Sequence, residues 1–317
     1  MNPQVKSCCA PKRDTSQAET AHVASSLNEN SGDTSGMVFL EGGTYLMGTD
    51  SEEGFPADGE GPVKNVTLDS FYIDRCTVTN REFAKFVNDT GYTTDAEKYG
   101  WSFVFYLFIS EQDKKNVLYV VRDTPWWWAV QNANWKKPEG PDSTIHNRKD
   151  HPVVHISWND AVKYCEWAGK RMPTEAEWEY AARGGLEQKR YPWGDELTPD
   201  GEHVCNIWQG TFPTQNEGLD GFLSTAPSKS FPPNSYGLYN MSGNVWEWCM
   251  DWFTVSDEST AVSLNPEGPN AGESKIIKGG SYLCHDSYCN RYRVAARSSN
   301  TPDSSTGNMG FRCVRDV

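Results

Sequence analysis

The sequence predicts a single domain of mixed α+β structure with little regular secondary structure, and three observations support this fold class. First, 27 glycines and 18 prolines among 317 residues indicate many turns and loops. Second, 13 Trp, 14 Tyr and 13 Phe supply large rings that can build a core without long helices or strands. Third, the helix signals are short, and periodicity weakens after residue 186. The length allows one large domain or two ordinary ones, but no linker divides residues 37–317.

Residues 1–36 are predicted to be a disordered polar tail, because they are rich in Ser, Thr, Asn, Asp, Glu and Ala and hold few large apolar side chains. The domain is predicted to span residues 37–317. Its first segment, MVFLEGGTYLMGT from residue 37, alternates around a glycine turn, which indicates a β-hairpin. Residues 63–76 are predicted as a second strand region.

Three short helices are predicted from capping boxes, in which a Ser or Thr and an acidic residue three positions later satisfy the first backbone N–H groups. Each is followed by an amphipathic run, and glycines end the second and third. The pairs are Thr79 with Glu82, Ser157 with Asp160, and Thr174 with Glu177.

The composition argues against two classes of partner. A net charge of -14 and a pI of about 4.9 disfavour nucleic acid, because phosphate binding needs a basic surface. The most apolar stretch, residues 101–109, is about half the length that spans a bilayer, and the first twenty residues hold no apolar signal region. We therefore expect no membrane partner and a cytoplasmic location. Nine cysteines in such a chain argue against a disulfide framework.

Cys284 and Cys289 lie in the run GGSYLCHDSYCNRYRVAARSSNTPDSS. A helix places positions five apart about 140° from each other, and a strand sends them to opposite faces. Their sulfurs meet only if the backbone bends, and the preceding Gly279 and Gly280 permit such a bend. Two adjacent thiolates suit a soft monovalent metal such as Cu(I). A local disulfide or two ordinary cysteines are the alternatives.

Three phrases of the sequence jointly resemble the formylglycine-generating enzymes, also called sulfatase-modifying factors, over residues 37–316. The shared framework phrases HPVVHISWNDA and RMPTEAEWEYAARGG support only the fold of a wider superfamily, whereas the paired-cysteine segment distinguishes the enzymes. The phrases are GPDSTIHNRKDHPVVHISWNDAVKYCEWAGKRMPTEAEWEYAARGG (140–185), YNMSGNVWEW (239–248) and GGSYLCHDSYCNRYRVAARSSNTPDSSTGNMGFRC (279–313).

The resemblance implies a C-type-lectin-like formylglycine-generating-enzyme fold and a reaction. The family oxidises a cysteine within a C-x-P-x-R motif of an unfolded sulfatase to Cα-formylglycine, which activates the sulfatase. Oxygen is consumed, an external thiol reductant supplies electrons, and the sulfur leaves as sulfide. An unfolded sulfatase peptide, molecular oxygen and a thiol are therefore the expected partners.

The resemblance also assigns roles to individual residues. The family's copper-binding cysteines fall on Cys284 and Cys289, and an active-site serine falls on Ser281. Tyr288 and Trp246 match residues that line the family's pocket. Taken from the residues alone, Ser281 is as well explained by a turn and the two aromatic residues by the core.

Two structural calcium sites are further implications of the resemblance. Hard cations take oxygen ligands from carboxylates, amides and backbone carbonyls, and such ions stabilise loop-rich backbone. The first set is Asn206, Ile207, Asp220 and Phe222, and the second is Asn240, Gly243, Val245 and Glu247.

Other residues in the segments that resemble the family can be explained in two ways. Arg291, Arg293 and Arg297 follow the paired cysteines, where the family binds its target peptide, but an arginine network that ties loops together explains them equally well. Cys165 and Cys313 match a pair that is bridged in secreted relatives, whereas we expect them reduced in a cytoplasm.

A second cysteine pair of secreted vertebrate relatives is replaced here by Ala182 and Val294. The loss of both partners together leaves no orphan thiol. It favours an enzyme of the bacterial type.

Two other functions share this fold. A non-catalytic lectin-like binding or scaffold protein needs the framework but not the paired cysteines. Iron-dependent sulfoxide synthases of the ergothioneine pathway carry an H-x-x-x-H-x-E motif; His151 and His155 match it, but Ser157 occupies the carboxylate position.

Overall fold

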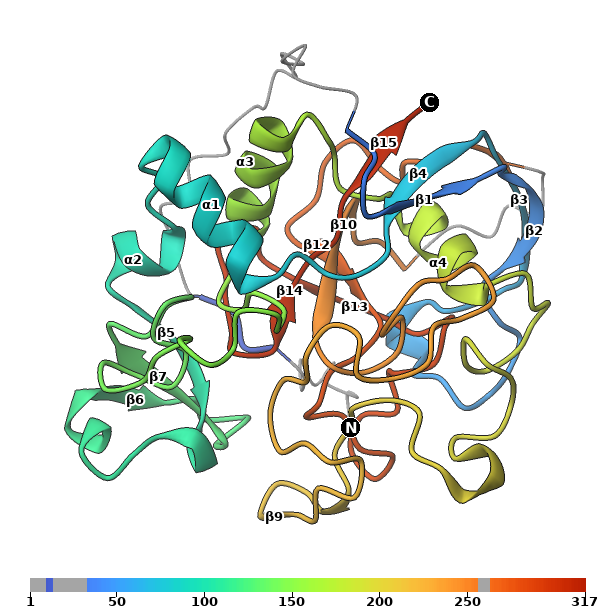
Figure 1. The fold of residues 1–317 in the computed structure, drawn as a ribbon. Helices are drawn as coiled ribbons and strands as arrows, with labels where there is room; N and C mark the ends of the chain where they lie inside the picture. The colour runs from blue at the N-terminus through green and yellow to red at the C-terminus, as the bar shows by residue number, and fades with distance from the viewer. Residues whose placement is uncertain (1–9, 14–32, 256–262) are drawn as a thin grey trace.

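The computed structural model describes residues 10–13, 33–255 and 263–317. A four-stranded sheet with the order β13-β12-β10-β14 lies at the centre of the molecule (Figure 1). Strand β10 is antiparallel to β12 and parallel to β14. The strands are β10 (Trp246–Trp252), β12 (Lys275–Lys278), β13 (Arg297–Asn300) and β14 (Met309–Gly310). The loop that connects β12 to β13 contains both cysteines of the predicted site.

Two further sheets contain the N-terminal strands, and they correct the predicted hairpin. Strand β1 (Met37–Leu40) pairs with β4 (Phe71–Asp74), and β2 (Gly43–Met47) pairs with β3 (Lys64–Leu68). The hairpin prediction was wrong because the glycine turn carries the chain from one sheet to another. Edge strands complete these sheets: β15 (Val314–Asp316) on β4 and β11 (Ser263–Leu264) on β3.

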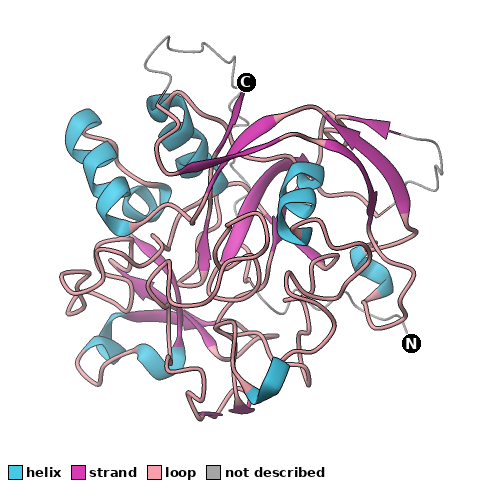
Figure 2. Ribbon diagram, turned by 45° about the vertical axis from the view of Figure 1, so that its right-hand side comes forward, coloured by secondary structure: helices cyan, strands magenta, loops and turns pink. Residues whose placement is uncertain are grey.

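A separate three-stranded sheet forms the lower left part of Figure 1. It contains β5 (Trp101–Phe105), β7 (Trp127–Gln131) and β6 (Val117–Val120). Loops make up much of the remaining chain, as Figure 2 shows in pink. The short elements among them are β8 (Gly210–Thr211), β9 (Gln215–Asn216) and the 3-10 helices η1 (Pro56–Asp58), η2 (Tyr106–Phe108), η3 (Asp113–Asn116) and η4 (Pro199–Gly201).

The three predicted helices are confirmed as α1 (Asn80–Thr90), α3 (Trp158–Ala168) and α4 (Glu175–Arg183), each with a complete capping box. Each helix ends before a glycine in the left-handed conformation. A fourth capping box, Thr94 with Glu97, begins a helix that the sequence reading missed, α2 (Asp95–Tyr99). None of the helices in the described ranges is long and apolar enough to cross a membrane.

The predicted aromatic core is confirmed. Five tryptophans are among the largest fully buried side chains. Such rings bury large areas per residue, which lets a core form with short strands and few helices. The five are Trp127, Trp178, Trp208, Trp246 and Trp248.

Four residues of the segment that we predicted as a disordered tail lie against the domain. Figure 1 shows residues 10–13 as a short blue segment beside the red C-terminal chain, and Ala10 and Arg13 are buried. The compositional prediction therefore does not describe residues 10–13. That prediction used the average composition of residues 1–36. Residues 10–13, by contrast, have specific partners in the domain. Residues 1–9 and 14–32 lie outside the described residues.

Candidate active site

The chain bends sharply after β12 and brings Cys284 and Cys289 together. Gly279 and Gly280 have φ values of 88° and 72°, and a Cβ on Gly280 would lie 3.0 Å from the backbone of Tyr292. Only glycine adopts such a conformation readily. The backbone N–H of Cys284 then donates to Ser281 O at 2.9 Å. The predicted bend is therefore confirmed.

The two sulfurs lie 3.4 Å apart, and both cysteines are buried. A disulfide requires about 2.0 Å, so the structure holds two separate thiols. Metal–thiolate bonds are about 2.3 Å long, and two ligands of one ion lie within twice that distance of each other. The separation of Cys284 Sγ and Cys289 Sγ meets this condition. The pair thus fits a low-coordinate site for a soft ion, which needs few ligands.

Ser281 lies beside Cys284, as the resemblance implies. Its Oγ is 3.9 Å from Cys284 Sγ, and its backbone N–H donates toward the same sulfur at 3.4 Å. Asn308 Nδ2 donates to Ser281 Oγ at 2.9 Å, and the backbone N–H of Leu283 donates to it at 3.3 Å. A hydroxyl oxygen can accept two hydrogen bonds, and these two N–H groups occupy both positions. The O–H group of Ser281 can therefore act only as a donor, toward a neighbouring sulfur or oxygen atom.

Asn308 is a site residue that the sequence reading missed. Its side chain is buried, and its Oδ1 accepts a hydrogen bond from Thr306 Oγ1 at 2.6 Å. This contact fixes the amide so that Nδ2 faces Ser281. The only signal in the sequence was its position in the phrase STGNMGF, 24 residues after Cys284.

A small apolar pocket opens next to Cys284, and Tyr288 lies in its wall. The Tyr288 ring stacks on Phe212 at 4.6 Å and meets Trp126 edge-on at 4.9 Å. The pocket is lined by Trp126, Trp127, Phe212, Ser281, Leu283, Cys284, Tyr288 and Asn308.

Trp246 belongs to the same cluster of buried side chains as Cys284 and Cys289. It is absent from the described residues that line the pocket. Its backbone N–H donates to Asn308 O at 2.8 Å, so Trp246 holds the backbone of a residue that lines the pocket.

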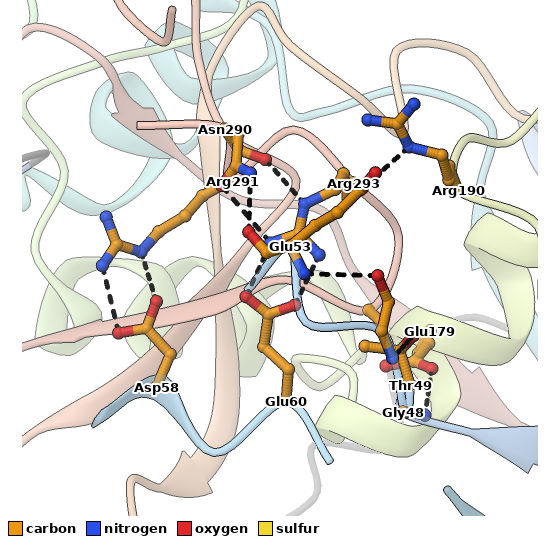
Figure 3. A network of polar contacts seen from close by, with 12 residues as sticks. Gly48, Thr49, Glu53, Asp58, Glu60, Glu179, Arg190, Asn290, Arg291 and Arg293 are labelled. Carbon is orange, nitrogen blue, oxygen red and sulfur yellow. Dashed lines mark hydrogen bonds and ion pairs between the residues drawn. The ribbon is translucent and has the colours of Figure 1, made fainter. Parts of the chain in front are cut away.

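Buried ion pairs hold the cysteine loop against the segment that contains η1 (Figure 3). Arg293 forms a two-bond contact with Glu60 at 2.6 and 2.7 Å, and Arg291 Nη2 donates to Asp58 Oδ1 at 3.1 Å. Arg297 pairs with Glu175 at 2.8 Å. The reading of these arginines as a network between loops is thus confirmed.

One of these arginines also contacts the site. Arg291 Nη1 lies 3.8 Å from Cys289 Sγ, where its charge favours a thiolate. Burial raises the pKa of Asp58, and the ion pair with Arg291 opposes that shift.

Comparisons with known proteins agree with this geometry. Residues 23–317 match the family model described as a sulfatase-modifying factor enzyme 1-like domain. The chain is 60% identical over 284 residues to a formylglycine-generating enzyme of Thermomonospora curvata, covering 89% of this chain and 93% of that protein. It is 58% identical to a Bos taurus protein of the same name, covering 88% of this chain and 74% of the relative. The chain belongs to the formylglycine-generating enzyme family.

Solved structures support the fold of the family. PvdO from Pseudomonas aeruginosa superposes with a TM-score of 0.63 at 24% identity, covering 89% of this chain and 94% of that one. CarF superposes with a TM-score of 0.52 at 22% identity, covering 89% of this chain and 98% of that one. The predicted single α+β domain with sparse secondary structure is confirmed.

The family also contains a relative named as inactive. The chain is 43% identical over 291 residues to the Inactive C-alpha-formylglycine-generating enzyme 2 of Bos taurus, covering 91% of this chain and 90% of the relative. Membership of the formylglycine-generating enzyme family therefore leaves catalysis to be argued from the site.

The first predicted calcium set fits a hard cation. Asp220 accepts backbone N–H groups from Ile207 at 3.1 Å and from Phe222 at 2.9 Å, and Gln209 Nε2 donates to both Asp220 Oδ2 and Ile207 O. Two oxygens of the set therefore converge. Asn206 Oδ1 is buried and has no hydrogen-bond partner in the described part of the chain. An unsatisfied buried oxygen beside a carboxylate is the donor set that calcium uses.

The second calcium set fits poorly. Asn240 Oδ1 is also buried without a hydrogen-bond partner among the described residues. The Glu247 carboxylate, however, forms a two-bond buried ion pair with Arg312 at 2.7 Å and accepts the Trp178 indole N–H at 2.7 Å. Its charge is already balanced, so the expected role of Glu247 as a calcium ligand does not agree with the structure.

The histidines of the iron alternative do not form a metal site. His155 is fully buried, with Nδ1 2.8 Å from Ser102 Oγ and Nε2 2.7 Å from the Pro138 carbonyl, so both ring nitrogens are occupied. His151 Nδ1 lies 3.0 Å from Thr225 Oγ1. Within the described ranges, no group of three or more His, Cys, Asp or Glu side chains is arranged to hold a metal.

Cys165 and Cys313 form a second pair of buried sulfurs. Cys165 Sγ and Cys313 Sγ lie 3.5 Å apart, and both thiols are free and buried. Burial raises the pKa of Cys313 well above its usual value, which disfavours a reactive thiolate. Ala182 and Val294, which replace the second pair, are buried in the apolar core.

Proposed function

We propose that this chain converts the cysteine of a C-x-P-x-R motif in an unfolded sulfatase to Cα-formylglycine and thereby activates the sulfatase. Cys284 and Cys289 hold Cu(I), molecular oxygen is the oxidant, and an external thiol is the reductant. Membership of the family supports the reaction. The observation that carries the proposal is the pair of buried sulfurs 3.4 Å apart beside a small pocket.

The chain's own residues prepare the pocket for a client thiol. Bound Cu(I) would supply the one-electron and oxygen chemistry that the protein side chains in the pocket lack. The Ser281 O–H, fixed by Asn308, is directed as a donor to a sulfur or oxygen atom next to Cys284. The rings of Tyr288, Phe212 and Trp126 exclude water, which strengthens each of these polar interactions.

Peptide turnover tests the proposal. Full-length protein with Cu(I), oxygen and a thiol reductant should convert a C-x-P-x-R peptide to a product in which one sulfur and two hydrogens are replaced by one oxygen. Cys289→Ser should abolish conversion and tight Cu(I) binding. Cys249→Ala is the matched control, because Cys249 is equally buried but belongs to a different cluster of side chains.

A scaffold function is the alternative outcome of the same experiment. Unchanged peptide, together with equal Cu(I) binding by wild type and Cys289→Ser, would favour a non-catalytic binding protein. The adjacent sulfurs of Cys284 and Cys289 beside a pocket argue for the enzyme, because a scaffold needs neither the sulfur pair nor the pocket.

We further propose one structural calcium ion, held by Asn206, Ile207, Asp220 and Phe222. The unsatisfied Asn206 Oδ1 and the convergence of Asp220 and Ile207 oxygens support it. The ion would stabilise a long loop that has little backbone pairing of its own.

A further inference from the structure

The N-terminal segment of this chain contains the client motif itself. Residues 9–13 read Cys-Ala-Pro-Lys-Arg, which matches C-x-P-x-R at every fixed position. Cys9 lies outside the described residues, whereas residues 10–13 are described and lie on the domain. We propose that the chain binds this segment as a client in its own peptide groove and that Cys9 is a substrate of its own reaction. This inference rests on the proposed function.

Arg13 fills a pocket that suits the arginine of the motif. Its side chain is 3% exposed, and Nη2 donates to Trp101 O at 2.8 Å and to Ser305 Oγ at 2.9 Å. Its backbone N–H donates to Ser304 Oγ at 2.8 Å. The guanidinium lies over the rings of Tyr99 and Trp101, 4.5 and 4.2 Å from their centroids. Stacking between aromatic faces combined with directed acceptors is selective for arginine over lysine.

The pocket also carries the negative charge that a buried guanidinium needs. Asp303, buried at 6% exposure, acts on Arg13 electrostatically, and its Oδ2 accepts a hydrogen bond from Tyr99 at 3.2 Å. A buried cation without a nearby anion is strongly unfavourable, so this carboxylate is part of a built site. The pocket therefore recognises both the shape and the charge of an arginine.

At residues 11–13 the exposure of the side chains follows the motif. Pro11, a fixed position, is buried, and its carbonyl accepts a hydrogen bond from Asn300 Nδ2 at 3.2 Å. Lys12, a variable position, is exposed and contacts Ser274 through its amine at 3.0 Å. Groove binding with the fixed residues inward and a variable residue outward is the pattern expected of a recognised peptide.

Ala10 connects the segment to the part of the core that contains the paired sulfurs. Ala10 is 2% exposed and belongs to the same cluster of buried side chains as Cys284 and Cys289. Cys9 directly precedes Ala10 in the sequence. Arg13 lies at the other end of the described segment, where it contacts Trp101, Ser304 and Ser305.

Covalent connection makes this binding effective. Twenty peptide steps join Arg13 to Asp33, and a chain of that length reaches at most about 65 Å. Tethered ligands experience an effective concentration on the order of millimolar, so the segment competes with free clients present at lower concentration. Cys9 is therefore the first cysteine that the site encounters.

The reaction at Cys9 balances with the reactants of the proposed function. The Cβ–S bond breaks, Cβ loses one of its two hydrogens and gains a carbonyl oxygen, and the sulfur leaves as hydrogen sulfide, with the thiol hydrogen among its two. Oxygen accepts four electrons, two from Cβ and two from two molecules of thiol reductant. The other products are one disulfide and one water.

Mass spectrometry of the N-terminal peptide tests the inference. The full chain is incubated with Cu(I), oxygen and thiol, cleaved at acidic residues and analysed. Residue 9 should lose sulfur and two hydrogens, gain one oxygen and react with a hydrazide probe. The rate constant should not change when the protein is diluted, because the reaction is intramolecular.

Single substitutions identify the residues on which the modification of Cys9 depends. Cys9→Ser should abolish the modification, whereas Cys8→Ser should retain it. Arg13→Ala should slow it about tenfold or more, because a buried charge-assisted contact is lost. Lys12→Ala is the matched control and should leave the rate within about twofold, because Lys12 is exposed and occupies a variable position of the motif.

An external C-x-P-x-R peptide in the same preparation separates the two proposals. If that peptide is converted and Cys9 is not, the self-modification is overturned and the function stands. If neither is converted, the proposed function fails. A Cys9 rate that rises in proportion to protein concentration would overturn intramolecular binding. Arg13→Ala should also lower the apparent KM of the external peptide.

Discussion

Asn308 Nδ2 donates to Ser281 Oγ at 2.9 Å, and the same oxygen lies 3.9 Å from Cys284 Sγ. A side-chain amide 27 residues further along the chain thus fixes the Ser281 hydroxyl beside the paired sulfurs. Its own orientation is set by Thr306 Oγ1 at 2.6 Å. These hydrogen bonds form a chain from Thr306 through Asn308 to Ser281, which lines the pocket that we propose for the client thiol.

We expect Asn308→Asp to impair turnover while leaving the fold intact. Aspartate has the same shape but cannot donate to Ser281, so the direction of the Ser281 O–H proton is lost. Peptide turnover should fall about tenfold or more, as expected for the loss of a directed donor. Affinity for Cu(I) should change little, because the Asn308 side chain bonds to Ser281 and Thr306 and is not a proposed copper ligand. An equal loss of metal affinity would instead indicate that Asn308 only supports the loop.

The ion pair of Arg293 with Glu60 should contribute strongly to stability. Both side chains are 4% exposed, so Arg293→Met leaves a carboxylate buried without its partner. The free energy of unfolding should fall by about 3–5 kcal/mol, measured by denaturant unfolding. Arg190→Met is the control: Arg190 and Glu53 are each 43% exposed, and this loss should cost under about 1 kcal/mol. Similar losses of unfolding free energy in the two variants would contradict the conclusion that the buried Arg293–Glu60 pair stabilises the fold more than the exposed Arg190–Glu53 pair.

Local signals in the sequence predicted the helices well, whereas strand pairing was beyond them. A capping box such as Thr174 with Glu177 is complete within four residues, so the sequence contains all the information that the helix start needs. The partner of β1 lies more than thirty residues away in β4, and no turn chemistry specifies it. The glycine turn after β1 therefore gave a plausible but wrong hairpin.

The site shows the same division between local and distant information. Gly279, Gly280 and the paired cysteines lie in one run, so the bend and the meeting of the sulfurs were predictable. Asn308 reaches Ser281 only through the fold, and no spacing rule connects them. The position of Arg13 was hidden because composition classified its whole surroundings as a polar tail. Its pocket is assembled from β5 and residues 303–305, far away in the sequence.

His155 should make stability depend on pH in the mildly acidic range. Burial lowers its pKa from 6.5 to about 4, although the hydrogen bond to Pro138 O opposes the shift. Between these pH values the unfolded chain binds more protons than the native state, so the free energy of unfolding falls as pH drops from 6.5 to 4. This contribution amounts to roughly 3 kcal/mol when complete.

The variant His155→Gln isolates that contribution from the carboxylates. Burial raises the pKa of Asp251 to about 7, so this group acts in the opposite direction: its effect on stability becomes less favourable as pH rises from 3.8 to 7. His155→Gln should be less stable than wild type at pH 7, and the difference should shrink steadily toward pH 4. A difference that stays constant across this range would show that His155 titrates normally.

Removal of calcium should lower the thermal stability of the domain. Chelation would take the proposed cation from Asn206, Ile207, Asp220 and Phe222, leaving the buried Asn206 Oδ1 without a partner. We expect the Tm to fall on chelation and to recover when calcium is added back, because an ion that binds only the native state stabilises it by mass action. Asp220→Asn should remove most of this response. Asp195→Asn serves as the control, because Asp195 is a surface carboxylate paired with Lys189. A Tm that does not respond to chelator in wild type would contradict the calcium site and leave the copper proposal untouched.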